Sequence, residues 1–242
     1  SGQEKIVGGE KDMRERFFKL RDKLLNTTPK ICIERAKIVT EAYKKYDAYP
    51  NIEKRAMALA DVLRNMTIYI EEEQLLAGNQ ASSNRAAPLF PEYAFAYILD
   101  ELDDLEKRSS DKFTITEENK KVLREILPWW EGKTLKDRAI AMQPQEVLDD
   151  RVTGVLGWQG NVSTGEGHIV PDYDMVVRLG FAGLRDKIQK HIDELDLSKP
   201  QDLEKLTFYR ACKAIIDGCL DYIKRYCILA EEQAEQCKDA AR

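Results

Sequence analysis

The chain has 242 residues, of which 43% are hydrophobic and 33% charged, and its 43 acidic and 38 basic side chains give a net charge of −5. This length and composition predict a globular protein with a sizeable core and argue against extensive disorder. The acidic balance offers no basic face for nucleic acid, and no apolar stretch approaches the ~20 residues of a membrane span, so neither nucleic acid nor a membrane is expected as a partner.

The first quarter of the chain has apolar residues at helical spacing. This periodicity predicts amphipathic helices over residues 14–25, 33–46 and 52–66. Residues 67–70 are then rich in β-formers, and residues 75–78 form a short apolar run, so we expect one or two short strands there. The serines, asparagine and prolines of residues 79–92 indicate a loop.

The rest of the chain is again mainly helical in pattern. Helical character returns over residues 93–107, and Thr116 is a suitable N-cap for the helix that follows it. Residues 143–171 contain five of the 13 glycines and are expected to be the least regular part. The remaining helices are predicted over residues 133–142, 176–195 and 203–236. The expected fold class is therefore mainly α, with one or two short strands.

The cysteines and the amino-terminal residues indicate the compartment. The five cysteines are odd in number and contain no C-x-x-C pair, which is typical neither of a disulfide framework nor of a zinc site. Cys212 and Cys219 share one face of a predicted helix, so we interpret them as small buried hydrophobes. The charged first residues lack the apolar segment of a signal peptide. We therefore predict a reduced, cytoplasmic protein without a metal site.

The glycine-rich residues 154–168 are the first candidate for chemistry. They lack the spacing of a phosphate-binding loop, but they place polar side chains among small residues that allow a close approach. His168 is one of two histidines and could bind a hydroxyl or shuttle a proton, with Thr164 and Glu166 nearby. A lone histidine is more often structural. These residues alone leave open a pocket lining and an exposed surface loop.

Other polar patterns favour solvated surface. His191 lies on a charged helical face, and the paired carboxylates Asp103–Asp104 and Asp149–Asp150 lie on predicted helices or turns. The sequence contains no G-x-S-x-G elbow of a serine hydrolase. No catalytic residue follows from these patterns.

Four short stretches stand out when they are taken in order. They are IERA with TEAY at residues 33–36 and 40–43, RA with EQLLAGN at 55–56 and 73–79, RAAPLFPE at 85–92, and GEGHIVPDY at 165–173. In this order and spacing they resemble the amino-terminal region of the glycyl radical enzymes, the pyruvate formate-lyase-like family. Within that family they are most similar to the glycerol and diol dehydratases and allied carbon–sulfur lyases.

The resemblance implies a fold and an activity. The chain would be the helical amino-terminal portion of a ten-stranded β/α barrel, homodimeric at full length and belonging to anaerobic metabolism. A partner enzyme that cleaves S-adenosylmethionine at an iron–sulfur cluster, a radical SAM activating enzyme, installs a glycyl radical in such proteins. The radical passes to a cysteine, whose thiyl abstracts a hydrogen atom from the substrate while a glutamate acts as base. Such enzymes are lyases of the EC 4 type.

The two radical loops of the family are not found in their places. The family's cysteine loop reads G-C-[VI]-E, whereas Cys219 follows Gly218 but precedes Leu220 and Asp221. Residues 151–155 imitate the radical loop R-V-[SA]-G-[YF] in mid-chain, without its aromatic residue. We assign no catalytic residue here. We expect residues 1–242 to be a fragment, the amino-terminal part of a pyruvate formate-lyase-like domain, and to be inactive alone.

The resemblance carries over one binding role. In the diol dehydratases the histidine of G-x-G-H contacts a substrate hydroxyl, so His168 is expected to line the substrate pocket, with Thr164 or Glu166 near it. The predicted function is elimination of water, or another leaving group, from a small polar substrate that carries a hydroxyl. Alternatives are carbon–sulfur cleavage of a hydroxyalkyl sulfonate, decarboxylation of an arylacetate, and a non-catalytic helical interaction module.

Overall fold

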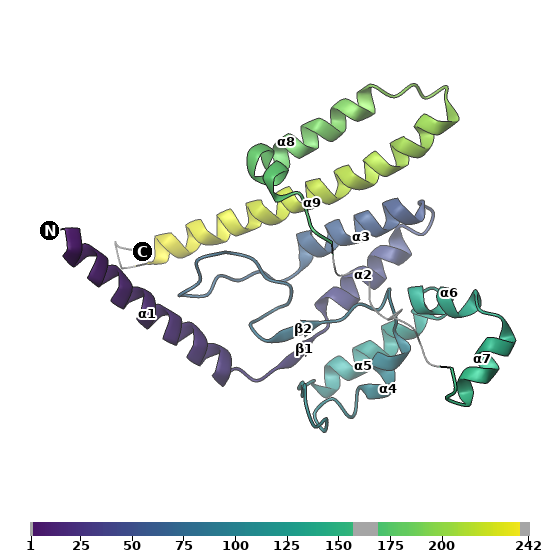
Figure 1. The fold of residues 1–242 in the computed structure, drawn as a ribbon, viewed down its shortest axis with the longest axis horizontal. Helices are drawn as coiled ribbons and strands as arrows, with labels where there is room; N and C mark the ends of the chain where they lie inside the picture. The colour runs from purple at the N-terminus through teal and green to yellow at the C-terminus, as the bar shows by residue number, and fades with distance from the viewer. Residues whose placement is uncertain (1, 157–168, 238–242) are drawn as a thin grey trace.

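A computed structural model describes residues 2–156 and 169–237, and side chains from residue 14 onward. This part of the chain is mainly helical, with one small parallel sheet, which confirms the predicted fold class (Figure 1). None of the described helices is long and apolar enough to cross a membrane. The elements are α1 Gly2–Asn26, β1 Lys30–Cys32, α2 Glu34–Lys45, α3 Asn51–Asn65, β2 Ala86–Pro88, α4 Ala96–Glu101, α5 Glu117–Ile126, a 3₁₀ helix Leu127–Trp130, α6 Leu135–Ala141, α7 Gln145–Val152, α8 Tyr173–Asp193 and α9 Pro200–Gln236.

The two strands lie outside the segments predicted for them. β1 pairs in parallel with β2, with Cys32 opposite Pro88. Residues 67–70 and 75–78 are irregular, and Leu75 and Leu76 are 70% and 85% exposed. The Gln74 side chain accepts a hydrogen bond from the Glu71 N–H and donates one to the Leu76 carbonyl. These bonds close a turn, so the backbone here does not form a strand. The strand prediction for these residues was therefore wrong.

Most predicted helices are confirmed, with three corrections. α2 and α3 match the predicted ranges, and Thr116 caps α5 by accepting the Asn119 N–H at 3.2 Å. α4 is much shorter than predicted: it ends at Glu101, and residues 102–107 form turns. α7 lies in the region predicted to be irregular. None of its residues is buried. A helix that buries no face does not need regularly spaced apolar residues, which are the signal that predicts a helix. α8 begins at Tyr173 and is interrupted at Gly180, whose φ of 62° is left-handed.

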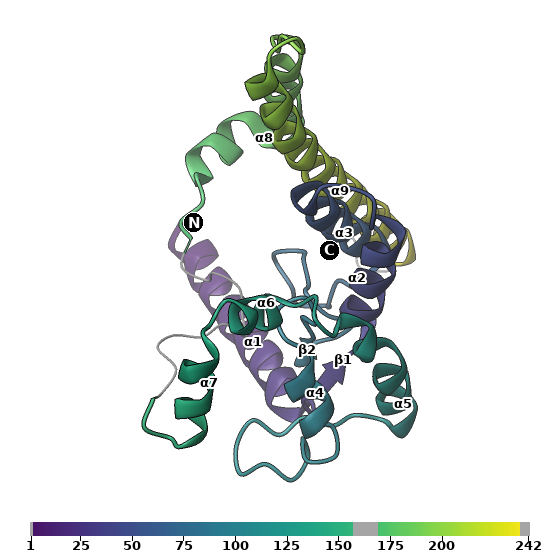
Figure 2. The ribbon, with the colours of Figure 1, turned by 90° about the vertical axis from the view of Figure 1, so that its right-hand side faces the viewer.

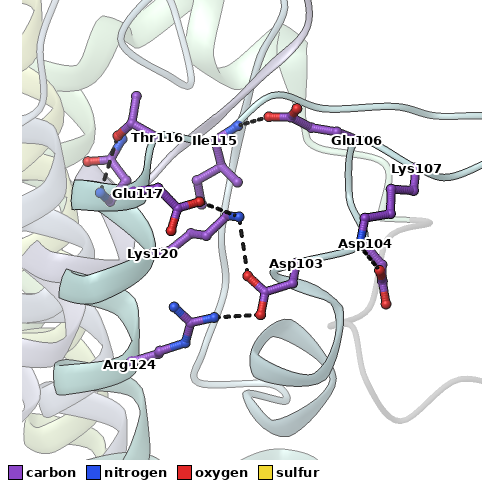
Figure 3. A network of polar contacts seen from close by, with 10 residues as sticks. Asp103, Asp104, Glu106, Lys107, Ile115, Thr116, Glu117, Lys120 and Arg124 are labelled. Atoms are coloured by element: carbon purple, nitrogen blue, oxygen red, sulfur yellow. Dashed lines mark hydrogen bonds and ion pairs between the residues drawn. The ribbon is translucent and has the colours of Figure 1, made fainter.

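Polar contacts fix the turns after α4 against α5 (Figure 3). Asp103 accepts hydrogen bonds from Lys120 at 3.2 Å and Arg124 at 2.7 Å, and the Glu106 carboxylate accepts the Ile115 N–H at 3.2 Å. The bonds from Lys120 and Arg124 lower the pKa of Asp103. Asp103 is thus an exposed side chain, as predicted, but its charge is paired.

The main core lies where β1, α2, α4, α5 and the 3₁₀ helix meet. Its largest fully buried side chains include Leu102, Leu123, Leu127 and Trp130. The Trp130 indole donates to the Thr40 hydroxyl at 2.9 Å, which satisfies both polar groups inside the core. This core holds α2 and the segment after β2 in fixed positions.

Helix α9 runs beside α3, as both views of the ribbon show (Figure 1, Figure 2). Small residues form this contact. Ala60 of α3 is fully buried, and a Cβ added at Gly218 of α9 would lie 2.8 Å from the Ala60 Cα. Glycine at 218 therefore permits the two backbones to approach closely. Arg225 of α9 also donates to the carbonyls of Leu63 and Met66, at the end of α3.

Candidate functional site

Three of the four motif stretches meet in the described structure, and an ion pair joins the first to the third. The Arg35 guanidinium on α2 faces the Glu92 carboxylate in a two-pronged contact, at 2.5 Å (Nη2–Oε1) and 3.1 Å (Nη1–Oε2). The two side chains are only 15% and 10% exposed. Arg35 also donates to the Leu89 carbonyl and lies 3.9 Å from the ring centre of Phe90. Such bidentate pairs fix both direction and distance.

A second arginine contact lies next to this pair. Arg55 on α3 donates to the Tyr93 hydroxyl at 2.7 Å, with its guanidinium 5.5 Å from the ring centre. The half-buried Tyr43 lies close by, and burial together with the negative charge of Glu92 raises the pKa of its phenol. Tyr43 is therefore a neutral hydroxyl near pH 7. Arg35 and Arg55 thus lie near the same pocket wall, and Glu92 is bound to Arg35.

The second motif is bound to α9 through Asn79. The Tyr222 hydroxyl accepts the Asn79 N–H at 3.0 Å and donates to the Asn79 carbonyl at 2.8 Å. The Tyr226 hydroxyl donates to the Asn79 side-chain oxygen, while the amide nitrogen donates to the carbonyls of Thr67 and Ala81. Burial raises the pKa of Tyr226, so it remains a donor at neutral pH. The loop from residue 67 to 81 is therefore fixed on α9.

The first motif also contacts the start of this loop. Glu34 accepts two hydrogen bonds from Thr67, one from the N–H at 2.9 Å and one from the hydroxyl at 2.6 Å. Arg35 and Glu34 are adjacent on α2. One turn of this helix therefore holds both the segment of residues 89–92 and the start of the 67–81 loop. Charged and amide side chains in these motifs act as structural links.

A pocket of about 410 Å³ opens beside the two arginines, between α2, α3, α9 and residues 90–93. Its polar side is formed by Tyr43, Arg55 and Tyr93, together with the Arg35–Glu92 pair. Its other walls are apolar and include Val39, Ala56, Leu59, Ala211 and Ile215. An arrangement with apolar walls and a few convergent polar groups is suited to binding a small molecule.

The fourth motif is only partly described. His168, Thr164 and Glu166, the side chains predicted to line a substrate pocket, lie outside the described residues. The described end of the motif includes Ile169 and Val170, which are 71% and 90% exposed. Asp172 caps α8 by accepting the Met175 N–H at 2.9 Å. The aspartate of this motif therefore begins a helix.

The cysteines and histidine of the described part have structural surroundings. Cys212 and Cys219 were predicted to be buried, but in the structure they are only half-buried on α9. This partial burial raises the pKa of both thiols. His191 is exposed, as predicted, and stacks on Tyr209 with ring centres 5.5 Å apart. Within residues 14–156 and 169–237, no group of histidine, cysteine and acidic side chains could hold a metal ion.

Sequence reasoning did not identify the tyrosines that hold Asn79. Tyr222 and Tyr226 are four residues apart, so the helical period places both on one face of α9. That spacing was an available signal, but its partner lies 143 residues earlier in the chain. Arg35 and Glu92 were noted only as motif letters, although their opposite charges could have suggested a pair.

Comparison with known proteins gives consistent matches. The family model described as pyruvate formate lyase-like matches residues 11–242. "Probable dehydratase YbiW" of Escherichia coli is 37% identical over 85% of this chain and 25% of its own length, and isethionate sulfite-lyase of Desulfovibrio desulfuricans is 32% identical over 99% and 30%. The structure of the glycerol-bound B12-independent glycerol dehydratase from Clostridium butyricum has a TM-score of 0.88 and 31% identity, over 94% of this chain and 29% of that one. The chain thus spans about a quarter to a third of the length of these proteins.

Proposed function

This chain belongs to the pyruvate formate lyase-like family, and we propose that it forms the amino-terminal part of a glycyl radical enzyme that eliminates water from a small hydroxyl-bearing substrate. The observation that carries the proposal is the Arg35–Glu92 pair, which joins two family motifs 57 residues apart. The chain that carries these motifs matches the structure of a glycerol dehydratase over 94% of its length. The proposed domain is the amino-terminal part of a pyruvate formate-lyase-like domain.

The proposed activity needs groups that this sequence does not supply. A radical SAM activating enzyme installs the glycyl radical, and a thiyl derived from it removes a hydrogen atom from the substrate. The part proposed for this chain is to bind the substrate, with His168 donating to or accepting from its hydroxyl and Thr164 or Glu166 beside it. We further propose a cytoplasmic location and a homodimer for the full-length enzyme.

The residues around the fourth motif support this division of roles. Apolar side chains within this motif and beside it are highly exposed in the described structure, namely Val155, Ile169, Val170, Tyr173 and Val177. Several large exposed apolar side chains in one stretch of sequence favour a surface that other protein covers. We propose that further parts of the full-length enzyme cover it and so hold the segment that carries His168.

The test compares the two histidines in the full-length enzyme. After anaerobic activation, the glycyl radical is measured by electron paramagnetic resonance, and dehydration of glycerol and propane-1,2-diol is assayed. We expect His168→Ala to lower kcat/KM by about tenfold or more, the loss of one hydrogen bond to the substrate, with the radical signal unchanged. His191→Ala is the matched control, because His191 lies on an exposed helical face. Equal activity of the two variants would contradict the role of His168.

A second candidate is carbon–sulfur cleavage of a hydroxyalkyl sulfonate. The 32% identity to isethionate sulfite-lyase over 99% of this chain favours it. It predicts sulfite release from isethionate by the activated full-length enzyme, and no aldehyde from propane-1,2-diol. The reverse result would support the dehydratase.

A candidate of another class is a helical interaction module. The exposed apolar residues of α1, Phe17, Phe18, Leu24 and Leu25, are the observation that favours it. It predicts that the 242-residue chain self-associates with rising concentration in analytical ultracentrifugation. A monomer at all concentrations would count against it.

A further inference from the structure

The pocket beside the two arginines has the dimensions and walls of a ligand site. Its volume of about 410 Å³ lies within the range of roughly 300–1,000 Å³ typical of small-molecule pockets. Its walls come from three helices, and buried small residues at Ala56 and Ala211 leave the space open between α3 and α9.

The polar side of the pocket carries one unbalanced positive charge. Glu92 is engaged by Arg35 through both carboxylate oxygens, so this pair is neutral as a unit. Arg55 bonds in the described structure only to the hydroxyl of Tyr93. No second carboxylate lines the pocket among the described residues. In a chain of net charge −5, this pocket therefore presents a cation to its contents.

We propose that this pocket binds an amphipathic monoanion, an aliphatic carboxylate whose head group pairs with Arg55 and whose chain lies on the apolar walls. A guanidinium presents several N–H donors in one plane, which suits a carboxylate, and only one of those of Arg55 is used by Tyr93. The Tyr43 hydroxyl, kept neutral by burial, is a further donor to the same head group. Val39, Leu59 and Ile215 offer apolar surface for the hydrocarbon chain. This proposal does not rest on the function proposed above.

The chemistry of the ligand sets the first experiment. Hexanoate, octanoate and 1-octanol are titrated into the 242-residue chain, with binding measured by calorimetry. Each buried methylene contributes about fourfold in affinity, so octanoate is expected to bind about 15-fold more tightly than hexanoate. Octanoate is expected to bind more tightly than 1-octanol, which has the same chain and no charge. Equal affinity for octanoate and 1-octanol, or no saturable binding, would overturn the proposal.

Two matched variants locate the positive charge. Arg55→Gln and Arg64→Gln remove the same charge from the same helix, but Arg64 pairs with Asp221 at 2.6 Å and does not line the pocket. We expect Arg55→Gln to weaken octanoate binding by about tenfold or more and to leave 1-octanol unchanged. Arg64→Gln should leave both unchanged. Equal losses in the two variants would refute the role of Arg55, and circular dichroism establishes that both variants are folded.

The cysteines provide a test of position that does not depend on a variant. Cys212 lines the pocket, whereas Cys227 lies exposed farther along α9. Thiol alkylation is followed residue by residue with mass spectrometry at pH 8.5, where the raised pKa of Cys212 still allows reaction. Octanoate is expected to slow the labelling of Cys212 several-fold and to leave that of Cys227 unchanged. Unchanged labelling of Cys212 at saturating octanoate would overturn the assignment to this pocket.

Discussion

Helix α9 packs against two helices in opposite ways. Towards α3 it presents the buried Ala211 and Gly218, and the backbones approach so closely that a Cβ at 218 would meet Ala60. Towards α8 it makes a half-buried contact in which Lys213 bonds to Gln189 at 2.6 Å, and no residue of α8 between Tyr173 and Asp193 is buried. Three motifs lie on the α3 side, whereas the histidine motif leads into α8. The described contacts therefore link the first three motifs to α3 and α9, whereas the described end of the fourth motif begins α8.

The largest expected effect is at the mostly buried Arg35–Glu92 pair. Glu92→Ala leaves the mostly buried Arg35 without its carboxylate and with the Leu89 carbonyl as its remaining hydrogen-bond partner, which is expected to lower the free energy of unfolding by about 3 kcal/mol. The control on α8 is Asp174→Ala, which removes the acid of the exposed Arg178–Asp174 pair. Its loss is expected to lower the free energy of unfolding by about 0.5 kcal/mol or less. Urea unfolding measures both. Similar losses would show that the two regions do not differ in stability.

The next effect concerns glycines in the two helices. Gly218→Ala forces α9 away from the Ala60 backbone and is expected to destabilise by about 1–3 kcal/mol, in spite of the better helix propensity of alanine. Gly183→Ala on α8 meets only the Leu179 Cβ, at 3.1 Å, a milder approach than the 2.8 Å to the Ala60 backbone at position 218. In urea unfolding, that variant should destabilise clearly less than Gly218→Ala. A stabilising Gly218→Ala would disprove the close contact.

A smaller effect is expected at the tyrosines of α9. Tyr226→Phe removes the hydrogen bond to the Asn79 side chain and should cost about 1–2 kcal/mol in thermal or urea unfolding. Tyr209→Phe is the control on the same helix, because Tyr209 contacts His191 through its ring and not through its hydroxyl. Hydrogen exchange of residues 67–81 should also rise in Tyr226→Phe alone. An unchanged exchange rate would argue that Asn79 is held by Tyr222 without Tyr226.

The smallest effect is the pH dependence at Asp103. Hydrogen bonds from Lys120 and Arg124 hold its folded pKa below the unfolded value, so its contribution is present above about pH 4 and is lost as the pH falls through the folded pKa. Asp103→Asn should therefore lower the urea midpoint slightly at pH 7, and this difference should shrink as the pH falls through the folded pKa. A difference that did not shrink at low pH would exclude the ion pairs as its cause.

The sequence predicted the elements that have a regular apolar period. α2, α3 and the Thr116 cap were found because their signals are local. β1 and β2 were missed because three-residue strands show no alternation, and β1 is recognisable only through its pairing with residues about 56 positions later. The links between Arg35 and Glu92, and between Asn79 and Tyr222, are also long-range, so motif letters gave the residues but not their partners. The prediction for His168 stays a prediction.

The buried indole of the core has an optical consequence. Trp130 is 1% exposed, bonded to Thr40, and has the ring of Trp129 edge-on at 5.0 Å. Because indole emission shifts to longer wavelength in water, the intrinsic fluorescence of this pair reports directly on the opening of the core. The third tryptophan of the chain is Trp158, and Trp158→Phe would leave only the core pair emitting. Fluorescence then distinguishes, without any added label, a variant that opens the core from one that releases only α8.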